Sequence, residues 1–433
     1  MKKVLIITYY WPPSAGGGVQ RWLKFAKYLP ANGWEPVVFT PENPAFDQID
    51  ESLLKDVSDD LEVIHFPIWE PLQVFKKVSG KKTRKQGIVS DRKKTTWIEK
   101  LIIWIRGNIF IPDPRKYWTK PSSIFLRPFI EERNIDLVIT TGPPHSMHLI
   151  GKRLKSMTGV KWIADFRDPW SEWDILDDLK TSTLAKKMHR RLERSVLREA
   201  SCVLTVSHKL KDRLEILGGN HNVEVITNGM EKEDLDTGDQ SSASKFRVTH
   251  LGLINHMRNP ENLWKQLELK CKKDQGFSDN LEIYMAGTVD QRILDFLQSS
   301  ELLREKLVYT SYVPHDEISK VYQESTVLLL LMNRSKNADW LIPGKLFEYM
   351  ATNRAILACG SLESEVNDML LEQGVPGVVA YDDDFMLMKR LDEQYESYIK
   401  GDVHVKYRNI DQYERKNLTE KLVNIFNQTV EGA

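Results

Sequence analysis

The sequence predicts an α/β protein with two doubly wound, Rossmann-like domains in tandem. Its 433 residues exceed the length at which a single hydrophobic core stops growing. Short apolar runs alternate with longer helical patterns from one end to the other, which is the rhythm of βαβ units. A polar stretch at 231–245 interrupts this rhythm once. We therefore expect an N-terminal domain over 1–235 and a C-terminal domain over 246–412.

The expected N-terminal domain contains seven strand candidates. Several are near-continuous apolar runs, as in parallel strands that are covered by helices on both faces. Helical patterns fall between them, such as those at 20–29 and 184–199. The strand candidates are 4–10, 36–40, 61–66, 137–142, 162–166, 203–207 and 223–227.

A second βαβ series follows the polar stretch at 231–245, which is rich in Ser, Asp and Gly. The chain then ends on an amphipathic helical pattern at 413–430, with Leu418, Leu422 and Ile425 at core spacing. This pattern by itself does not say which domain the helix covers. The strand candidates of the second series are 247–254, 281–287, 307–313, 326–332, 355–360 and 377–381.

The composition is that of a soluble globular protein, with 41% hydrophobic and 28% charged residues. No run approaches the roughly 20 apolar residues that span a bilayer. The basic, apolar start resembles a signal peptide, but it stops at Trp11-Pro12-Pro13 without a small-residue cleavage site. We therefore expect a cytoplasmic protein with a buried first strand. The cysteines Cys202, Cys271 and Cys359 lack metal-ligand spacing and are expected to be reduced core thiols.

Charge is unevenly distributed along the chain. Residues 1–200 hold 34 Lys and Arg against 24 Asp and Glu, and the remainder holds 27 against 37. The basic excess peaks at 76–106, where only Asp91 and Glu99 oppose eleven basic residues. Trp and Ile residues lie within and after this run, up to 111. The segment 76–111 therefore predicts docking on an anionic membrane surface, because each Lys or Arg near such a surface contributes about 1 kcal/mol. The alternative is a solvated loop followed by a core helix.

The sequence at 343–351 puts a cation and an anion one turn apart at the start of a helical pattern. Pro343 and Gly344 punctuate the chain, and Leu346 begins an apolar face. A helix N-terminus attracts anions. Lys345 is therefore predicted to bind phosphate, and Glu348 to bind hydroxyls of a nucleoside diphosphate. An ordinary surface Lys–Glu pair is the alternative.

Gly16, Gly17 and Gly18 form the first strand-to-helix turn and would let the backbone approach a ligand closely. A dinucleotide fingerprint would need a third glycine where Arg21 stands, so a dehydrogenase is disfavoured. A tight turn without a ligand is the other interpretation. In the second half, Gly252 ends a strand in the same way, and Arg258 follows as a second cation for the same diphosphate.

Two further candidates follow strands of the first half, at the carboxyl edge where α/β sites form. His145, with His148 nearby, comes after 137–142 and could bond a sugar hydroxyl or a phosphate. Asp168 comes after 162–166 and could accept a bond from an acceptor hydroxyl. A structural histidine and a pair between Arg167 and an aspartate are the alternatives.

These motifs, in this order, resemble the retaining GT-B glycosyltransferases of the bacterial surface-polysaccharide type, also called group 1 or family 4-like. The likeness rests on the Gly-rich turn, Asn228-Gly229, Gly252 with Arg258, and the segment 343–351. Pro143-Pro144, and Arg167-Asp168 with Trp170, are similar to a subgroup related to fucosamine transferases. The resemblance covers nearly the whole chain.

The resemblance implies two Rossmann-like domains facing a central cleft, with the helix at 413–430 packing back on the first domain. It implies catalytic roles for Arg258, Lys345, His145 and Asp168. It also implies that Gly252, Leu346 and Glu348 hold the nucleotide, with Glu348 on the ribose hydroxyls, and that the loop Gly16-Gly17-Gly18 closes over phosphate or acceptor. No metal or cofactor is implied, because the two cations stabilise the leaving diphosphate. One departure concerns the donor sugar, since Trp340, beside Asp339, stands where many members have a glutamate.

The expected function is transfer of a sugar from a nucleoside-diphosphate sugar to a lipid-linked or polysaccharide acceptor in cell-surface glycan synthesis. The expected location is the cytoplasm, with peripheral attachment at the inner face of the plasma membrane. Nucleic acid is not an expected partner. Two alternatives stay open: a nucleotide-sugar epimerase on the same fold, which needs carboxylate acid/base pairs, and an inactive nucleotide-binding protein.

Overall fold

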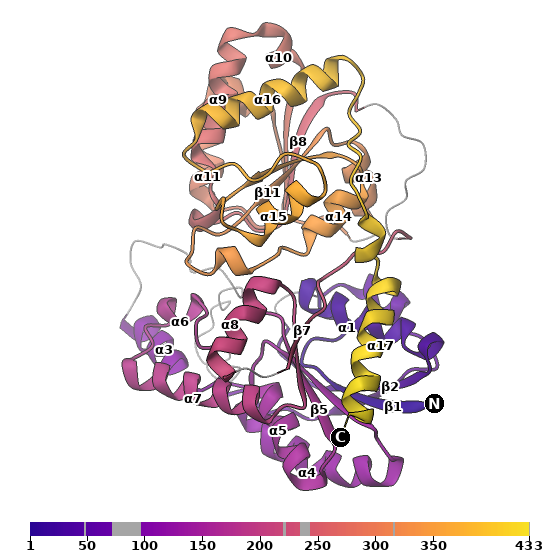
Figure 1. Ribbon diagram of the computed structural model, residues 1–433. Helices are drawn as coiled ribbons and strands as arrows, with labels where there is room; N and C mark the ends of the chain where they lie inside the picture. Colours follow the sequence, from indigo (N-terminus) through magenta and orange to yellow (C-terminus); the bar gives the residue numbers. More distant parts are fainter. Residues whose placement is uncertain (47–48, 72–96, 220–221, 234–242, 315–316, 433) are drawn as a thin grey trace. The chain divides into compact units, whose positions relative to one another are not determined.

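The computed structural model describes residues 1–46, 49–71, 97–219, 222–233, 243–314 and 317–432 (Figure 1). The chain forms two compact units. Unit 1 comprises Met1–Thr227 and Arg415–Ala433, and unit 2 comprises Asn228–Glu414. The boundary between the units falls at Thr227, ahead of the expected linker at 231–245. Much of that linker lies outside the described residues.

Unit 1 contains a parallel seven-stranded sheet in the order β3-β2-β1-β4-β5-β6-β7. β1 lies between β2 and β4, with Leu5 beside Val37 on one side and Val138 on the other. The strand order reverses there, which is where ligand sites of doubly wound sheets form. The strands are β1 (Lys2–Ile7), β2 (Trp34–Pro41), β3 (Glu62–Phe66), β4 (Leu137–Gly142), β5 (Lys161–Phe166), β6 (Cys202–Thr205) and β7 (Val223–Val225).

The helices of unit 1 cover this sheet, and several begin at side-chain caps. Ser182 accepts a hydrogen bond from Ala185 N–H at the start of α7, and Ser207 does the same for Leu210 N–H at α8. The helices are α1 (Gly17–Tyr28), α3 (Trp97–Asn108), α4 (Lys116–Arg133), α5 (Ser146–Thr158), α6 (Ile175–Asp178), α7 (Thr183–Glu199) and α8 (His208–Gly218), with 3-10 turns η1 (Pro30–Asn32) and η2 (Glu51–Asp56).

The last helix, α17 (Arg415–Glu431), belongs to unit 1 and lies beside α1 (Figure 1). Its apolar stripe, Leu418, Leu422 and Phe426, enters the same core as the residues of β1 and α1. Phe426 meets Trp34 edge to face, with ring centroids 5.2 Å apart. Burying each such side chain contributes roughly 1.5–3 kcal/mol, so this stripe holds the chain terminus on unit 1.

Unit 2 contains a parallel five-stranded sheet in the order β10-β9-β8-β11-β12, with two apolar cores packed against it. Its strands are β8 (Phe246–Leu251), β9 (Leu281–Ala286), β10 (Leu307–Thr310), β11 (Val327–Leu331) and β12 (Ala355–Cys359). Its helices are α9 (Glu261–Lys273), α10 (Gln275–Asn280), α11 (Gln291–Ser299), α12 (Glu301–Arg304), α13 (Ile318–Gln323), α14 (Lys345–Ala351), α15 (Glu365–Glu372) and α16 (Asp384–Ile399), with 3-10 turns η3 (His256–Arg258), η5 (Ala338–Trp340) and η6 (Ile410–Tyr413).

Two parallel, helix-covered sheets confirm the predicted fold class of two Rossmann-like domains. One expected strand is wrong. The run at 377–381 makes only a single bridge, between Val379 and Cys359, because the next residues turn directly into α16. The three cysteines are buried free thiols, as expected. Among the described residues, none of the helices has the length and apolarity to span a bilayer.

Candidate functional site

The first cluster of candidate residues lies in unit 2, where β8 ends. Gly252 has φ 123°, a left-handed conformation that favours glycine. A Cβ on this residue would lie 2.6 Å from the Lys345 ammonium nitrogen. Gly252 is therefore needed both for its backbone angle and for the space that the lysine occupies. The structure brings together two residues that are 93 positions apart in the sequence.

Arg258 lies close enough to influence Lys345, because its charge helps to lower the pKa of that ammonium. Burial is the main cause of the lowered pKa of Lys345, and Glu348 opposes the shift. Burial also lowers the pKa of Arg258. Neither cation has an ion pair within the described part of the chain, and Arg258 Nε donates to Asn333 Oδ1 at 2.6 Å. Two partly desolvated cations, neither of which forms an ion pair with a described residue, form a site for a polyanion.

Glu348 lies one turn after Lys345 on α14. Its Oε2 accepts a hydrogen bond from the buried Tyr322 hydroxyl at 2.8 Å. Burial raises the pKa of Tyr322 well above its ordinary value, so the phenol keeps its proton and fixes the carboxylate. The other oxygen remains available to accept from a hydroxyl. No sequence signal pointed to Tyr322, which comes from α13.

Leu346 does not face the candidate site. Its side chain is fully buried in the core beside β11, and its N–H donates to the Pro343 carbonyl at 3.0 Å. Leu346 therefore anchors α14. Because this helix is only seven residues long, the positive charge of the cluster comes from its side chains more than from a helix dipole. Trp340, the departure from the expected motif, lies in η5 together with Asp339.

His250 is a member of this cluster that we did not predict as a site residue from the sequence. It lies on β8, and its Nδ1 is 2.9 Å from the Leu329 carbonyl oxygen. Burial, together with the charges of Lys345 and Arg258, lowers the pKa of His250 to about 3. The imidazole is therefore neutral near pH 7 and adds no charge to the two cations. Its position at a strand end was the only available signal.

The second cluster lies in unit 1, in the loops that follow β1, β4 and β5. Gly16 has φ 105° and precedes α1, which begins at Gly17. A Cβ on Gly18 would lie 2.5 Å from Arg167 Nη1. The glycine turn therefore admits a cation from the β5 loop, and Arg167 lies against its backbone.

Arg21, the residue that breaks the dinucleotide fingerprint, is completely buried. Its guanidinium donates to both carboxylate oxygens of Asp165, at 3.2 and 3.0 Å. Trp22 Nε1 and Thr141 Oγ1 donate to the same carboxylate at 2.7 and 2.8 Å. Among the described residues, the carboxylate of Asp165 thus forms its ion pair with Arg21, and the alternative of an Arg167–aspartate pair does not hold for Asp165. Removing one partner of a buried ion pair costs roughly 3–5 kcal/mol, so this pair ties α1 to β5.

His145 is buried and stacks on Trp170, with ring centroids 5.0 Å apart and planes at 4°. Neither ring nitrogen meets full hydrogen-bond geometry with a described residue, although the Pro169 backbone lies near enough to raise the pKa of the ring slightly against the effect of burial. Burial is the main cause that lowers the pKa of His145 well below its ordinary value, and the neighbouring His148 adds to the shift. His148 is structural: its Nδ1 is 3.0 Å from Thr140 Oγ1, and burial lowers its pKa to about 3. A neutral His145 is left to exchange a hydrogen bond with a ligand.

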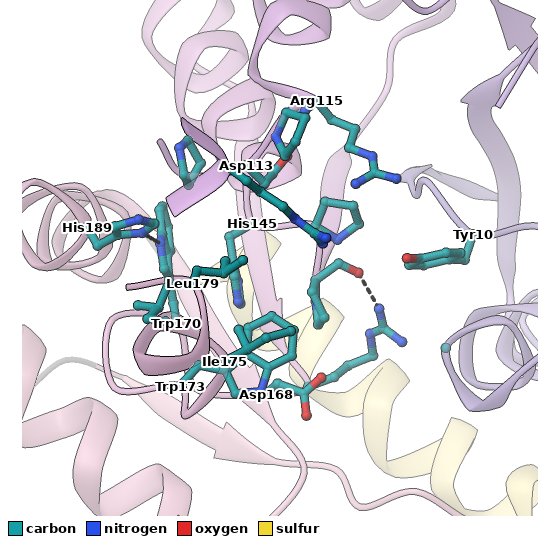
Figure 2. Close-up of a pocket in the computed structure, with 18 of the residues that line it drawn as sticks. Tyr10, Asp113, Arg115, His145, Asp168, Trp170, Trp173, Ile175, Leu179 and His189 are labelled. Carbon is teal, nitrogen blue, oxygen red and sulfur yellow. Dashed lines mark hydrogen bonds between the residues drawn. The ribbon is translucent and has the colours of Figure 1, made fainter. Parts of the chain in front are cut away.

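A cavity of about 380 Å³ opens beside His145. Figure 2 shows Trp170, Trp173, Ile175 and Leu179 along one side, with Tyr10 and Arg115 opposite them. Asp168 also faces this cavity, and burial raises the pKa of its carboxyl while Arg167 opposes the shift. The full lining is Tyr10, Ala15, Gly18, Arg106, Pro112, Asp113, Pro114, Arg115, Pro143, Pro144, His145, Arg167, Asp168, Trp170, Trp173, Ile175, Leu176, Leu179 and His189.

The loop that carries Asp168 and Trp170 is held by α7. Glu193 accepts hydrogen bonds from the N–H groups of Trp170 and Ser171, at 3.3 and 3.1 Å. His189, one turn earlier, accepts from Trp170 Nε1 at 3.1 Å. Burial raises the pKa of Glu193 to about 7. The spacing of His189 and Glu193 places both on one helix face, but only the fold shows which loop they hold.

The expected membrane segment is only partly described. The basic residues at 76–94 lie outside the described residues. Helix α3 is described, and four of its apolar side chains, Trp97, Ile98, Leu101 and Trp104, are between 45% and 72% exposed. Among the described residues, His, Cys, Asp and Glu form no group of three that could hold a metal ion.

Comparison with known proteins gives a family match for just under half of the chain and a fold for all of it. Residues 16–229 match the family described as "Glycosyl transferase 4-like domain". A search of curated protein sequences gives no match. Sucrose-phosphate synthase from Thermosynechococcus elongatus superposes with a TM-score of 0.68 at 13% identity, covering 100% of both chains.

Two further solved structures share the fold. Staphylococcus aureus TarM, in complex with α-GlcNAc-glycerol and UDP among its ligands, has a TM-score of 0.59 at 11% identity, covering 99% of this chain and 100% of that one. A putative UDP-N-acetylglucosamine 2-epimerase from Listeria monocytogenes has a TM-score of 0.57 at 10% identity, covering 100% and 98%. At such identities these likenesses establish the GT-B fold alone.

Proposed function

We propose that this chain, which belongs to the glycosyl transferase 4-like family, transfers a sugar from a nucleoside-diphosphate sugar to a lipid-linked or polysaccharide acceptor. The observation that carries the proposal is the pair Arg258 and Lys345. Both are partly desolvated, neither has an ion pair in the described chain, and Gly252 leaves the ammonium open beside the end of β8. A diphosphate supplies the counter-charge that this pair lacks.

The chemistry follows from where charge develops. As the glycosidic bond to phosphate breaks, negative charge grows on the diphosphate and positive charge on the sugar. Arg258 and Lys345 stabilise the diphosphate, so a metal ion is not required for that task. Glu348, fixed by Tyr322, accepts hydrogen bonds from ribose hydroxyls. The departing phosphate takes the proton of the acceptor hydroxyl on the same face of the sugar, which gives retention without a protein nucleophile.

Unit 1 supplies the acceptor site in this proposal. Asp168 accepts a hydrogen bond from the acceptor hydroxyl, and His145, neutral because it is buried, meets the donor sugar. The loop Gly16-Gly17-Gly18 closes on the substrate, with Arg167 lying against it. The role in surface-glycan synthesis rests on the likeness of Pro143-Pro144 and Trp170 to the fucosamine-transferase subgroup.

Membrane attachment at the cytoplasmic face of the plasma membrane is part of the same proposal. It rests on the exposed apolar side of α3, because Trp and Ile at a membrane surface bury area that is otherwise in water. Flotation with vesicles that contain anionic lipid should retain the protein at low salt. Trp97→Ser with Trp104→Ser should release it, whereas Leu362→Ser, an exposed leucine of unit 2, should not.

An epimerase is the alternative that the shared fold keeps open, since it would convert a nucleotide sugar without an acceptor. The two activities are separated by a screen of donor sugars, followed by mass spectrometry with and without acceptor lipid. The proposal expects one donor to be consumed only when acceptor is present, with a heavier acceptor as product. Conversion of the donor to an isomer of equal mass in the absence of acceptor would instead identify an epimerase.

A further inference from the structure

The cavity beside His145 combines three kinds of surface that a single ligand could satisfy. It has guanidinium groups, a carboxylate and an apolar wall. Several of its charges are already neutralised within the protein. Asp113 accepts from Ser146 N–H and Oγ–H, both at 2.8 Å, so it caps α5. Arg115 Nε lies 2.9 Å from Glu70 Oε1, so its charge is paired.

Arg106, the third guanidinium of the lining, also has a partner within the protein, so Arg167 and Asp168 are left as the charges for a ligand. Arg167 donates from Nη2 to the Pro143 carbonyl at 2.6 Å, and its Nε has no hydrogen-bond partner. Within the described chain, neither Arg167 nor Asp168 forms an ion pair closer than 4.0 Å. A guanidinium in this state donates hydrogen bonds to a phosphate, and a carboxylate accepts a hydrogen bond from a hydroxyl. A sugar phosphate presents both groups side by side.

The apolar wall leads from these charges to helix α3. Trp173, Ile175 and Leu179 line the cavity opposite Arg115 (Figure 2). The chain after α6 then packs tightly on α3, because a Cβ on Gly107 would lie 2.5 Å from the Leu179 carbonyl oxygen. Asn108 joins the same contact by accepting from Ser182 N–H at 2.8 Å. The apolar wall is therefore next to the helix whose outer face carries the exposed tryptophans.

We propose that this cavity binds the phosphorylated end of an amphiphilic acceptor. The phosphate lies at Arg167, a hydroxyl of the adjoining sugar lies at Asp168, and the aliphatic chain follows Ile175 and Leu179 toward α3. This inference rests on the proposed function, and it selects a lipid-linked acceptor over a soluble polysaccharide. A polysaccharide has no aliphatic chain, so it would leave the apolar wall of Ile175 and Leu179 exposed to water.

Calorimetry with three probes tests the inference on the full-length protein: farnesyl diphosphate, farnesol and inorganic pyrophosphate. Farnesyl diphosphate should bind at least about tenfold more tightly than either fragment, since it satisfies both ends of the site. Arg167→Gln should weaken the binding of farnesyl diphosphate by about tenfold and leave the affinity for farnesol unchanged. Ile175→Ser should weaken the binding of farnesyl diphosphate and of farnesol alike. Arg194→Gln, an exposed arginine of α7, is the matched control and should change none of them.

The outcomes separate this inference from the proposed function. Lys345→Ala should leave farnesyl diphosphate binding intact, because Lys345 belongs to the nucleotide site. Equal binding of pyrophosphate and farnesyl diphosphate, or insensitivity to both Arg167→Gln and Ile175→Ser, would overturn the inference. Failure of farnesyl diphosphate to bind, while nucleoside diphosphates still bind in a Lys345-dependent manner, would overturn it and leave the proposed function standing. Circular dichroism and thermal melting establish that each variant is folded.

Discussion

Units 1 and 2 share one packing arrangement, in which a cationic side chain lies against a glycine, but they use different cations. In each unit, a glycine after the first strand leaves the space of its missing Cβ to a cation from a distant element. In unit 1 the pair is Gly18 and Arg167, and in unit 2 it is Gly252 and Lys345. The difference lies in the backbone, because Gly252 has a left-handed φ and Gly18 does not. A glycine at such a turn therefore marks where a charged side chain approaches, and its dihedral angle decides whether substitution also strains the fold.

Lys345→Ala should have the largest effect. It removes the cation that faces the leaving diphosphate, so turnover should fall by roughly 10²–10³-fold. Stability should change little, because burial already disfavours the charged form of Lys345, whose pKa is lowered. The measurement is initial rate with a saturating donor, together with the urea midpoint. Lys336→Ala, an exposed lysine nearby in sequence, is the control. Normal turnover of Lys345→Ala would remove this residue from the site.

Gly252→Ala should combine a loss of activity with a loss of stability. The new Cβ displaces the Lys345 ammonium. An alanine at position 252 must also keep the positive φ of the glycine, which adds roughly 1–3 kcal/mol of backbone strain. Gly401→Ala provides the matched control, since Gly401 also has positive φ and a Cβ there would meet nothing within 4 Å. Both variants should be destabilised, but only Gly252→Ala should lose turnover, by roughly tenfold or more. Equal activity of the two variants would mean that the position of Lys345 does not matter.

Gly18→Ala should affect activity with little loss of stability. Its Cβ meets the end of a flexible arginine side chain, which can move away at small cost. The Michaelis constant for the acceptor should rise by up to about tenfold, whereas that for the donor should not change. A double-mutant cycle with Arg167→Gln measures the coupling. Additive effects of the two substitutions would show that Gly18 does not act through Arg167.

Stability should fall at acid pH because both units bury histidines, and unit 1 should be the more sensitive, since burial lowers the pKa of His145, His148 and His189 there and of His250 in unit 2. Burial lowers the pKa of His148 and of His250 to about 3. Below pH 6.5 the unfolded chain binds protons that the folded chain refuses, so stability should fall as pH falls from about 6.5 toward 3. Each histidine contributes up to about 1.4 kcal/mol per pH unit. Urea midpoints at pH 7 and pH 5 should therefore differ less for His148→Gln than for the wild type, and an unchanged difference would contradict the buried neutral state.

The fold could be predicted from the sequence because βαβ rhythm is a local signal that repeats. The prediction of a strand at 377–381 was wrong because a short apolar run occurs both in strands and in segments that make only a single bridge. The site was predictable only where the type of residue indicates a function, as the cations Lys345 and Arg258 and the glycines of the turns do. The partners that hold these groups come from remote elements. Nothing near Arg21 indicates Asp165, and nothing near Glu348 indicates Tyr322, because such pairs depend on which strands become neighbours.

The most direct test of the central claim is calorimetry of the full-length protein with a panel of nucleoside diphosphates. We predict that at least one of them binds at a single site. We also predict that Lys345→Ala or Arg258→Gln weakens that binding by about tenfold or more, while Arg167→Gln leaves it unchanged. Absence of binding by every nucleoside diphosphate, in a protein shown to be folded, would contradict the assignment of unit 2 as the donor site.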